Sequence, residues 1–212
     1  MMNTDANLTT TQQEFGSFAY GSYYGPDPKL YDRLISAAKN GDLAGVKHYV
    51  EQGANIRADN DYVLRRAVPS GHFDTIKYCI DQGCNIRMED DFPLRWAAAN
   101  NRLDILRYCV ALGGDIRSNN DDALRTAAAK GHLDVVKYCV EQQSDIQARR
   151  NEALRLAAEN GHADIVQYCR EQIEALQAQE ILQKEKEILE KKNAQAAART
   201  TRHQNLRNFL RR

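Results

Sequence analysis

The sequence repeats itself every thirty residues, and this self-similarity constrains the fold more than any other feature. Each copy carries one leucine at the same place, at Leu34, Leu64, Leu94, Leu124 and Leu154. Small residues, mostly alanine pairs, follow three and four positions later, and a glycine comes next in four copies, at Gly41, Gly71, Gly131 and Gly161. The third copy has Asn101 there, and Asn tolerates the left-handed conformation well, so we predict a turn with positive φ at this column. A repeat of this length indicates an array of similar supersecondary units.

Each unit is predicted to be a helix, a turn and a second helix. Apolar residues recur three and four apart on both sides of the turn glycine, which is typical of two short antiparallel helices of about ten residues. One such pair cannot bury its apolar face alone, so the copies must stack on their neighbours. The expected fold is therefore an all-α solenoid of five helix-turn-helix units over residues 31–172, with a long C-terminal helix after it.

Composition adds only broad limits. The 212 residues are 42% hydrophobic, and 29 basic side chains balance 29 acidic ones. No apolar run is long enough to span a membrane, and the start lacks the basic and apolar regions of a signal peptide. We therefore expect an intracellular, cytoplasmic protein, with a nuclear location also open. The five cysteines include no C-x-x-C pair, which argues against a disulfide framework and a structural zinc site.

The best-formed copy is ALRTAAAKGHLDVVKYCVEQQSDI, residues 123–146. Its leucine, double alanine, Gly-His and hydrophobic second helix resemble the ankyrin repeat. The resemblance covers residues 31–172, as copies at about 31–60, 61–90, 91–120, 121–150 and 151–172, between an N-terminal arm (1–30) and a charged extension (173–212). It implies a non-catalytic module that binds a protein partner, with no cofactor and no small-molecule substrate.

Two features depart from the family pattern. Arginine stands where the family has the histidine of Thr-Pro-Leu-His, at Arg65, Arg95, Arg125 and Arg155. The period is also thirty rather than the usual 33, and the missing residues fall where the family has its β-hairpin finger, so we expect a tight turn there. This short-loop type is similar to ankyrin proteins of giant viruses of amoebae. That similarity implies a viral protein that engages a host factor in the host cell.

Several residues resemble chemical groups but have structural interpretations. Asp61/Arg65, Asp91/Arg95 and Asp121/Arg125 are predicted to cap each first helix and to form i,i+4 ion pairs, although the arginines could instead recognise phosphates or carboxylates. The cysteine column, Cys79, Cys109, Cys139 and Cys169, is predicted to lie in the core. His72, His132 and His162 are expected to hydrogen-bond at the turns. No nucleotide, zinc or acyl-transfer motif occurs, so we expect no catalytic or metal site.

Binding is expected at positions that vary between copies and point away from the core. Ankyrin proteins usually bind through the concave face and its turns, and the predicted partner-binding residues here are Tyr62, Arg66, Met88, Phe92, Trp96, Thr126, Arg149 and Arg150. Trp96 is the only tryptophan, and with Tyr62, Arg66 and Phe92 nearby it predicts a hot spot. The alternative is that Trp96 and Phe92 merely pack on each other.

The C-terminal region breaks the repeat. Ile173 replaces the glycine that should stop the last helix, and no Gly or Pro follows, so the helix should run from Asp164 to Ala198. Residues 173–198 could make a homo-oligomeric coiled coil, which would make this an assembly or structural protein, or could fold back to cap the last copy. Residues 173–190 have a net charge of −3 and residues 191–212 have +7.

The two ends of the chain offer further possibilities. Thr200 or Thr201 is predicted to cap a last short helix in the basic tail, whose arginines are Arg199, Arg202, Arg207, Arg211 and Arg212. Such a tail could contact nucleic acid, an anionic membrane or an acidic protein, and nucleic-acid binding is our third functional hypothesis. The N-terminal arm is either loose or lays Phe15, Phe18, Tyr20, Tyr23 and Tyr24 on the first copy.

Overall fold

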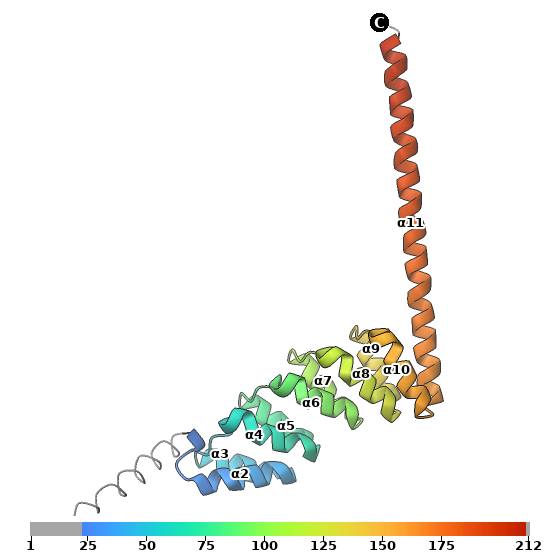
Figure 1. The fold of residues 1–212 in the computed structure, drawn as a ribbon. Helices are drawn as coiled ribbons and strands as arrows, with labels where there is room; N and C mark the ends of the chain where they lie inside the picture. The colour runs from blue at the N-terminus through green and yellow to red at the C-terminus, as the bar shows by residue number, and fades with distance from the viewer. Residues whose placement is uncertain (1–22, 211–212) are drawn as a thin grey trace, which may run out of the picture. The chain divides into compact units, whose positions relative to one another are not determined.

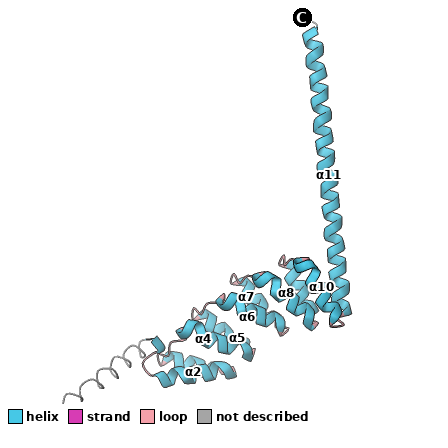
Figure 2. Cartoon of the chain, viewed as in Figure 1, coloured by secondary structure: helices cyan, strands magenta, loops and turns pink. Residues whose placement is uncertain are grey.

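The computed structural model describes residues 23–210, and within that range the chain is helical, without strands (Figure 2). The first helices of the copies are α2 (Pro28–Asn40), α4 (Ala58–Ala67), α6 (Met88–Ala99), α8 (Ser118–Lys130) and α10 (Ala148–Glu159). The second helices are α3 (Leu43–Glu51), α5 (Phe73–Asp81), α7 (Leu103–Ala111), α9 (Leu133–Glu141) and α11 (Ala163–Leu210). The predicted all-α solenoid followed by a long helix is confirmed.

The first helices pack side by side, α2 on α4, α6 on α8 and α8 on α10, and α2, α4, α6 and α8 each contact the second helix of their own copy (Figure 1). The column leucines Leu34, Leu64, Leu94 and Leu124 are fully buried between the copies. Leu154 in the last copy is only half-buried, since no sixth copy follows it. The chain forms two compact units, one ending at Ile165 and the other beginning at Val166.

The turn inside each copy has the predicted left-handed residue. Asn101 has a φ of 55°, which confirms the expectation drawn from its column, and the glycines at the same column also have positive φ. In the second copy, Pro69 lacks a backbone N–H and α4 passes into a 3₁₀ turn, Val68–Ser70, before Gly71.

The turn between copies is as short as predicted, and its geometry is unusual. Three consecutive residues are left-handed in each case, 59–61, 89–91, 119–121 and 149–151, with φ between 49° and 61°. Asn and Asp occupy most of these positions, and they tolerate this region better than other non-glycine residues. Glu89, Arg149 and Arg150 are the exceptions.

The N-terminal edge of the stack is covered by the end of the arm. The backbone N–H of Asn55 donates to the carbonyl of Tyr24 at 2.9 Å, and the Tyr24 hydroxyl donates to Asp59 at 3.1 Å. Tyr24 also packs on Tyr31, with ring centroids 4.8 Å apart. Tyr23 and Tyr24 therefore lie on the first copy, as one of the two alternatives predicted, whereas Phe15, Phe18 and Tyr20 lie outside the described residues.

Helix α11 is a single helix of 48 residues. The prediction that the last helix continues past Ile173 is confirmed. The prediction of a separate short helix that begins at Thr200 or Thr201 is wrong, because α11 continues unbroken to Leu210. No Gly or Pro interrupts residues 163–210, and threonine is tolerated inside a helix. A fold-back within residues 173–198 would need a turn, and α11 has none there.

Candidate partner-binding surface

Each aspartate before a first helix bonds to the turn that follows the second helix of the same copy. Asp61 accepts a hydrogen bond from the backbone N–H of Asn85 at 2.9 Å, and Asp91 and Asp121 accept those of Asp115 and Asp145 at 3.1 Å. All three carboxylates are buried. Burial raises the pKa of Asp121, although the hydrogen bond from the backbone N–H of Asp145 acts in the opposite direction.

The predicted capping of each aspartate's own helix is therefore wrong. Asp61, Asp91 and Asp121 are left-handed and stand directly before the right-handed helix, where a cap would be. Their carboxylates turn away from that helix and accept hydrogen bonds from the turn after the second helix of the same copy. Their ionic partners lie four residues earlier: Arg57 is 3.7 Å from Asp61, Arg87 is 3.4 Å from Asp91, and Arg117 is 3.9 Å from Asp121.

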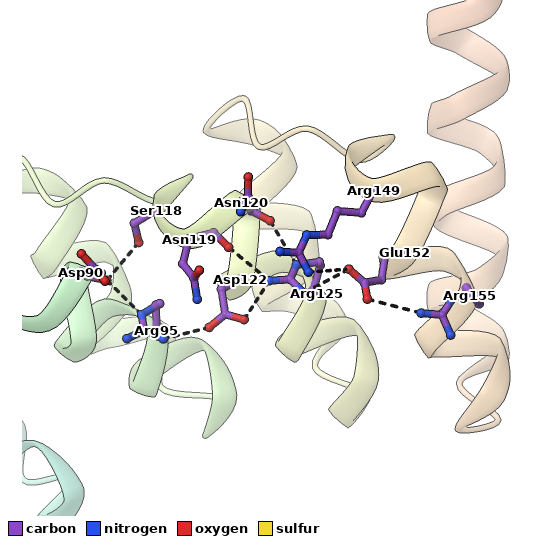
Figure 3. A network of polar contacts seen from close by, with 10 residues as sticks. All are labelled: Asp90, Arg95, Ser118, Asn119, Asn120, Asp122, Arg125, Arg149, Glu152 and Arg155. Carbon is purple, nitrogen blue, oxygen red and sulfur yellow. Dashed lines mark hydrogen bonds and ion pairs between the residues drawn. The ribbon is translucent and has the colours of Figure 1, made fainter.

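The arginine column bridges copies, as Figure 3 shows for Arg95 and Arg125. Arg125 donates to the carbonyls of Asn119 and Asn120 in its own left-handed turn and pairs with Glu152 of the next copy at 3.1 Å. Arg95 binds its own turn in the same way and pairs with Asp122 at 3.2 Å. The predicted i,i+4 pairs with Asp91 and Asp121 are replaced by these bridges.

These bridges weaken the case for anion recognition by the arginine column. Arg65 pairs at 3.1 Å with Glu89, in the left-handed turn that leads into the next copy, and side chains such as that of Arg125, which is 12% exposed, are committed within the stack. Sequence reasoning missed Asp122 and Glu152 as partners. The available signal was an acidic residue 27 positions after Arg95 and after Arg125.

The cysteine column lies in the core as predicted. Cys79, Cys109, Cys139 and Cys169 are fully buried, and burial raises the pKa of the first three thiols to about 12. A thiol that stays protonated is neither a nucleophile nor a metal ligand.

The turn histidines bond across copies. A ring nitrogen of His132 lies 3.3 Å from the carbonyl oxygen of Ala99, and one of His162 lies 3.1 Å from that of Ala129. Arg102 takes the histidine place in the third copy and donates to the Gly71 carbonyl. Across the described residues, His, Cys, Asp and Glu side chains form no group that could hold a metal ion.

Five predicted binding residues on the first helices are not among the structural groups described above. We call them the first-helix surface and define it as Tyr62, Arg66, Phe92, Trp96 and Thr126. All five side chains are half-buried. The Tyr62 ring lies below the guanidinium groups of Arg65, at 5.5 Å, and Arg66, at 6.0 Å. A methyl group at Gly71 would come within 3.2 Å of the Trp96 ring, so the indole lies against the turn of the preceding copy.

The other predicted binding residues are placed differently. Met88 is 7% exposed and belongs to the core, because it precedes the left-handed turn on the same inward column as Ala58. It offers almost no surface to a partner. Arg149 and Arg150 are exposed at the last left-handed turn, and Arg149 is 3.8 Å from Glu152.

The basic tail is described only in part. Arg199 is exposed on α11. Arg202 and Arg207 also lie in α11, but the described side chains end before them, and Arg211 and Arg212 fall outside the described residues. Among the helices that are described, none is long and apolar enough to cross a membrane.

Comparison with known families agrees with this architecture. A family model described as ankyrin repeats in three copies matches residues 34–120 and 109–175, about two thirds of the chain. The chain belongs to the ankyrin-repeat family. Ankyrin repeats are generic protein–protein interaction modules, generally without catalytic activity. The search of curated proteins found no match, and the similarity to giant-virus ankyrin proteins stays a prediction.

Proposed function

We propose that this ankyrin-repeat protein binds a protein partner through its first-helix surface, without catalysis. The observation that carries the proposal is the grouping of Tyr62, Arg66, Phe92 and Trp96 as half-buried side chains on α4 and α6. Aromatic residues and arginine dominate the binding energy of protein interfaces. Bonds between the copies hold the two helices, so these side chains need little ordering when a partner binds.

The exposed Arg149 and Arg150 extend this proposal toward the last copy. Left-handed arginines are costly where Asn or Asp would serve, and residues held in such conformations concentrate at functional sites. They add positive charge to the turn edge, so an acidic patch on the partner fits there. If the viral similarity holds, that partner is a host factor.

The test is the affinity of Trp96→Ala for a partner isolated with the wild-type chain and then purified. We expect binding about tenfold weaker, or about 1.4 kcal/mol, because Trp96 is a predicted hot spot. Tyr138→Ala is the matched control, since Tyr138 is a half-buried aromatic residue on α9 that stacks with Arg107 at 5.0 Å. A loss below about 1 kcal/mol for Trp96→Ala would place the binding energy elsewhere.

A further inference from the structure

Helix α11 carries an apolar stripe that the structure leaves uncovered. Ile181, Leu182, Ile188 and Leu189 are 51–58% exposed, and every side chain from residue 174 to residue 199 is exposed. The two Ile-Leu pairs are seven residues apart, so at 3.6 residues per turn they lie on one side of the helix. Large apolar side chains grouped on one exposed face mark an interaction site.

One column of residues, three of them charged, runs along the middle of this stripe. Ala178, Glu185, Lys192 and Arg199 follow one another at seven-residue intervals between the edges set by the Ile-Leu pairs. The acidic member therefore precedes the basic members along the helix. The whole region has the same polarity, with a net charge of −3 over residues 173–190 and +7 over residues 191–212.

This order of charges distinguishes the two ways in which a second copy could cover the stripe. In a parallel pair, Glu185 would face Glu185 and the two segments of charge +7 would lie together. In an antiparallel pair centred between Ile188 and Leu189, Glu185 faces Lys192 of the second copy, and Ile188 faces its Leu189. The basic segment of each copy then lies along the acidic segment of the other, and like charges are kept apart.

We propose that α11 associates with α11 of a second copy of this chain as an antiparallel helix pair over residues 174–203. The pairing would bury both Ile-Leu pairs of each chain and would form two Glu185–Lys192 contacts related by symmetry. It goes beyond the proposed partner binding, since it uses none of the first-helix surface. The stack of each copy stays available to its own partner.

The first test is the mass of the full-length chain by analytical ultracentrifugation over a wide concentration range. We expect a concentration-dependent mass of two chains. Glu185→Lys or Lys192→Glu alone should weaken the dimer about tenfold or more, because each change creates facing like charges. The double variant should restore wild-type dimerisation, since the charges are exchanged. A monomer at every concentration, a larger assembly, or no restoration in the double variant would overturn the proposal.

The second test determines the orientation by cross-linking. All five native cysteines are buried, so only the introduced, exposed cysteines are expected to form the cross-link. Ala178 faces Arg199 of the second copy in the antiparallel pair. Mixed Ala178→Cys and Arg199→Cys chains should therefore form a disulfide-linked dimer under mild oxidation, whereas either variant alone should not. Efficient cross-linking of Ala178→Cys to itself would establish a parallel pair and contradict the proposal.

Discussion

At the scale of single residues, one aspartate in each of the second, third and fourth copies has two roles. Asp91 adopts the left-handed conformation that the short turn requires, with φ of 59°, and it accepts the backbone N–H of Asp115. Serine or threonine could accept a hydrogen bond but tolerates this conformation less well than Asp or Asn. The last copy has Asn151 at this column, and there the second helix runs on to Leu210 instead of ending in a turn.

Asp91→Ala should lower the free energy of unfolding by about 2–4 kcal/mol. It leaves the N–H of Asp115 without its acceptor, at about 1–3 kcal/mol, and puts a Cβ-bearing residue with no polar side chain at positive φ, at about 1 kcal/mol more. Asp91→Asn keeps the acceptor and the conformation and should lose less than half as much. Urea denaturation of both variants measures the difference, and equal losses would show that the hydrogen bond contributes little.

The buried thiols predict a loss of stability at alkaline pH. Cys79, Cys109 and Cys139 have a pKa of about 12 when folded, against about 8.5 for a free thiol. Above the free value the unfolded chain releases protons that the folded chain retains, so stability falls as pH rises toward 12. Each thiol should cost about 1.4 kcal/mol per pH unit in this window.

The measurement is urea denaturation at pH 8 and pH 10, chosen below and above the free thiol pKa of about 8.5. The reference is a variant with alanine at all three positions. Tyrosine and lysine titrate in both proteins, so the difference in pH dependence isolates the thiols. The wild type should lose several kcal/mol more than the variant over this interval, and parallel pH curves would refute thiol burial.

At the scale of elements, the left-handed turn that replaces the finger determines how the copies connect. It ends one copy, delays the start of the next first helix until after the aspartate, and presents carbonyls that Arg95 and Arg125 bind. Asn60, Asp90 and Asn120 occupy its middle position in three copies, and Arg150 occupies it in the last.

Arg150→Asn should therefore stabilise the protein by about 0.5–1 kcal/mol, because Asn adopts positive φ at lower cost. The reverse change at the equivalent position, Asn120→Arg, should destabilise it by a similar amount. Thermal unfolding of the two variants checks both signs. If Arg150 also binds the partner, Arg150→Asn should weaken binding while it raises stability, which is the usual compromise at a functional site.

Much of this architecture could be predicted from the sequence, because five copies of one pattern identify helices and turns that a single copy would leave ambiguous. The helix pairs, the positive φ of Asn101, the buried cysteines and the unbroken passage through Ile173 all follow from columns or from missing breakers. The partners of Arg95 and Arg125 did not follow, because a spacing of four residues suggested a pair on one helix. The left-handed Asp91 and Asp121 break that helical geometry, and the true partners lie in the next copy.

The burial of Met88 shows that the prediction of binding residues from local sequence has the same limit. A methionine between two copies looked like a turn residue, yet it shares an inward column with Ala58, which is 1% exposed. The alignment of Met88 with Ala58 in the repeat is the signal that indicates burial. Tyr62, Arg66 and Trp96 could be assigned to the first helices from their spacing, but their half-buried state depends on neighbouring copies that local sequence does not describe.

At the scale of the whole molecule, the chain combines a stack of repeats with a long helix, and each has its own proposed interaction. Within the stack, the ion pairs of Arg95 and Arg125 and the contacts of the turn histidines connect neighbouring copies, so local stability depends on neighbour contacts. Residues that vary between copies on α4 and α6 are then free to determine which partner binds. The central claim is that this first-helix surface makes the contact.

Site-specific photo-cross-linking in the native cell tests that claim most directly. A photoreactive phenylalanine analogue at Arg66 or Thr126 places the probe on the first-helix surface, and the same probe at Lys130 on the end of α8 or at Gln183 on α11 serves as the control. We predict one partner cross-linked from positions 66 and 126 and absent from positions 130 and 183. A partner captured only from the control positions would contradict the assignment of the first-helix surface as the binding site.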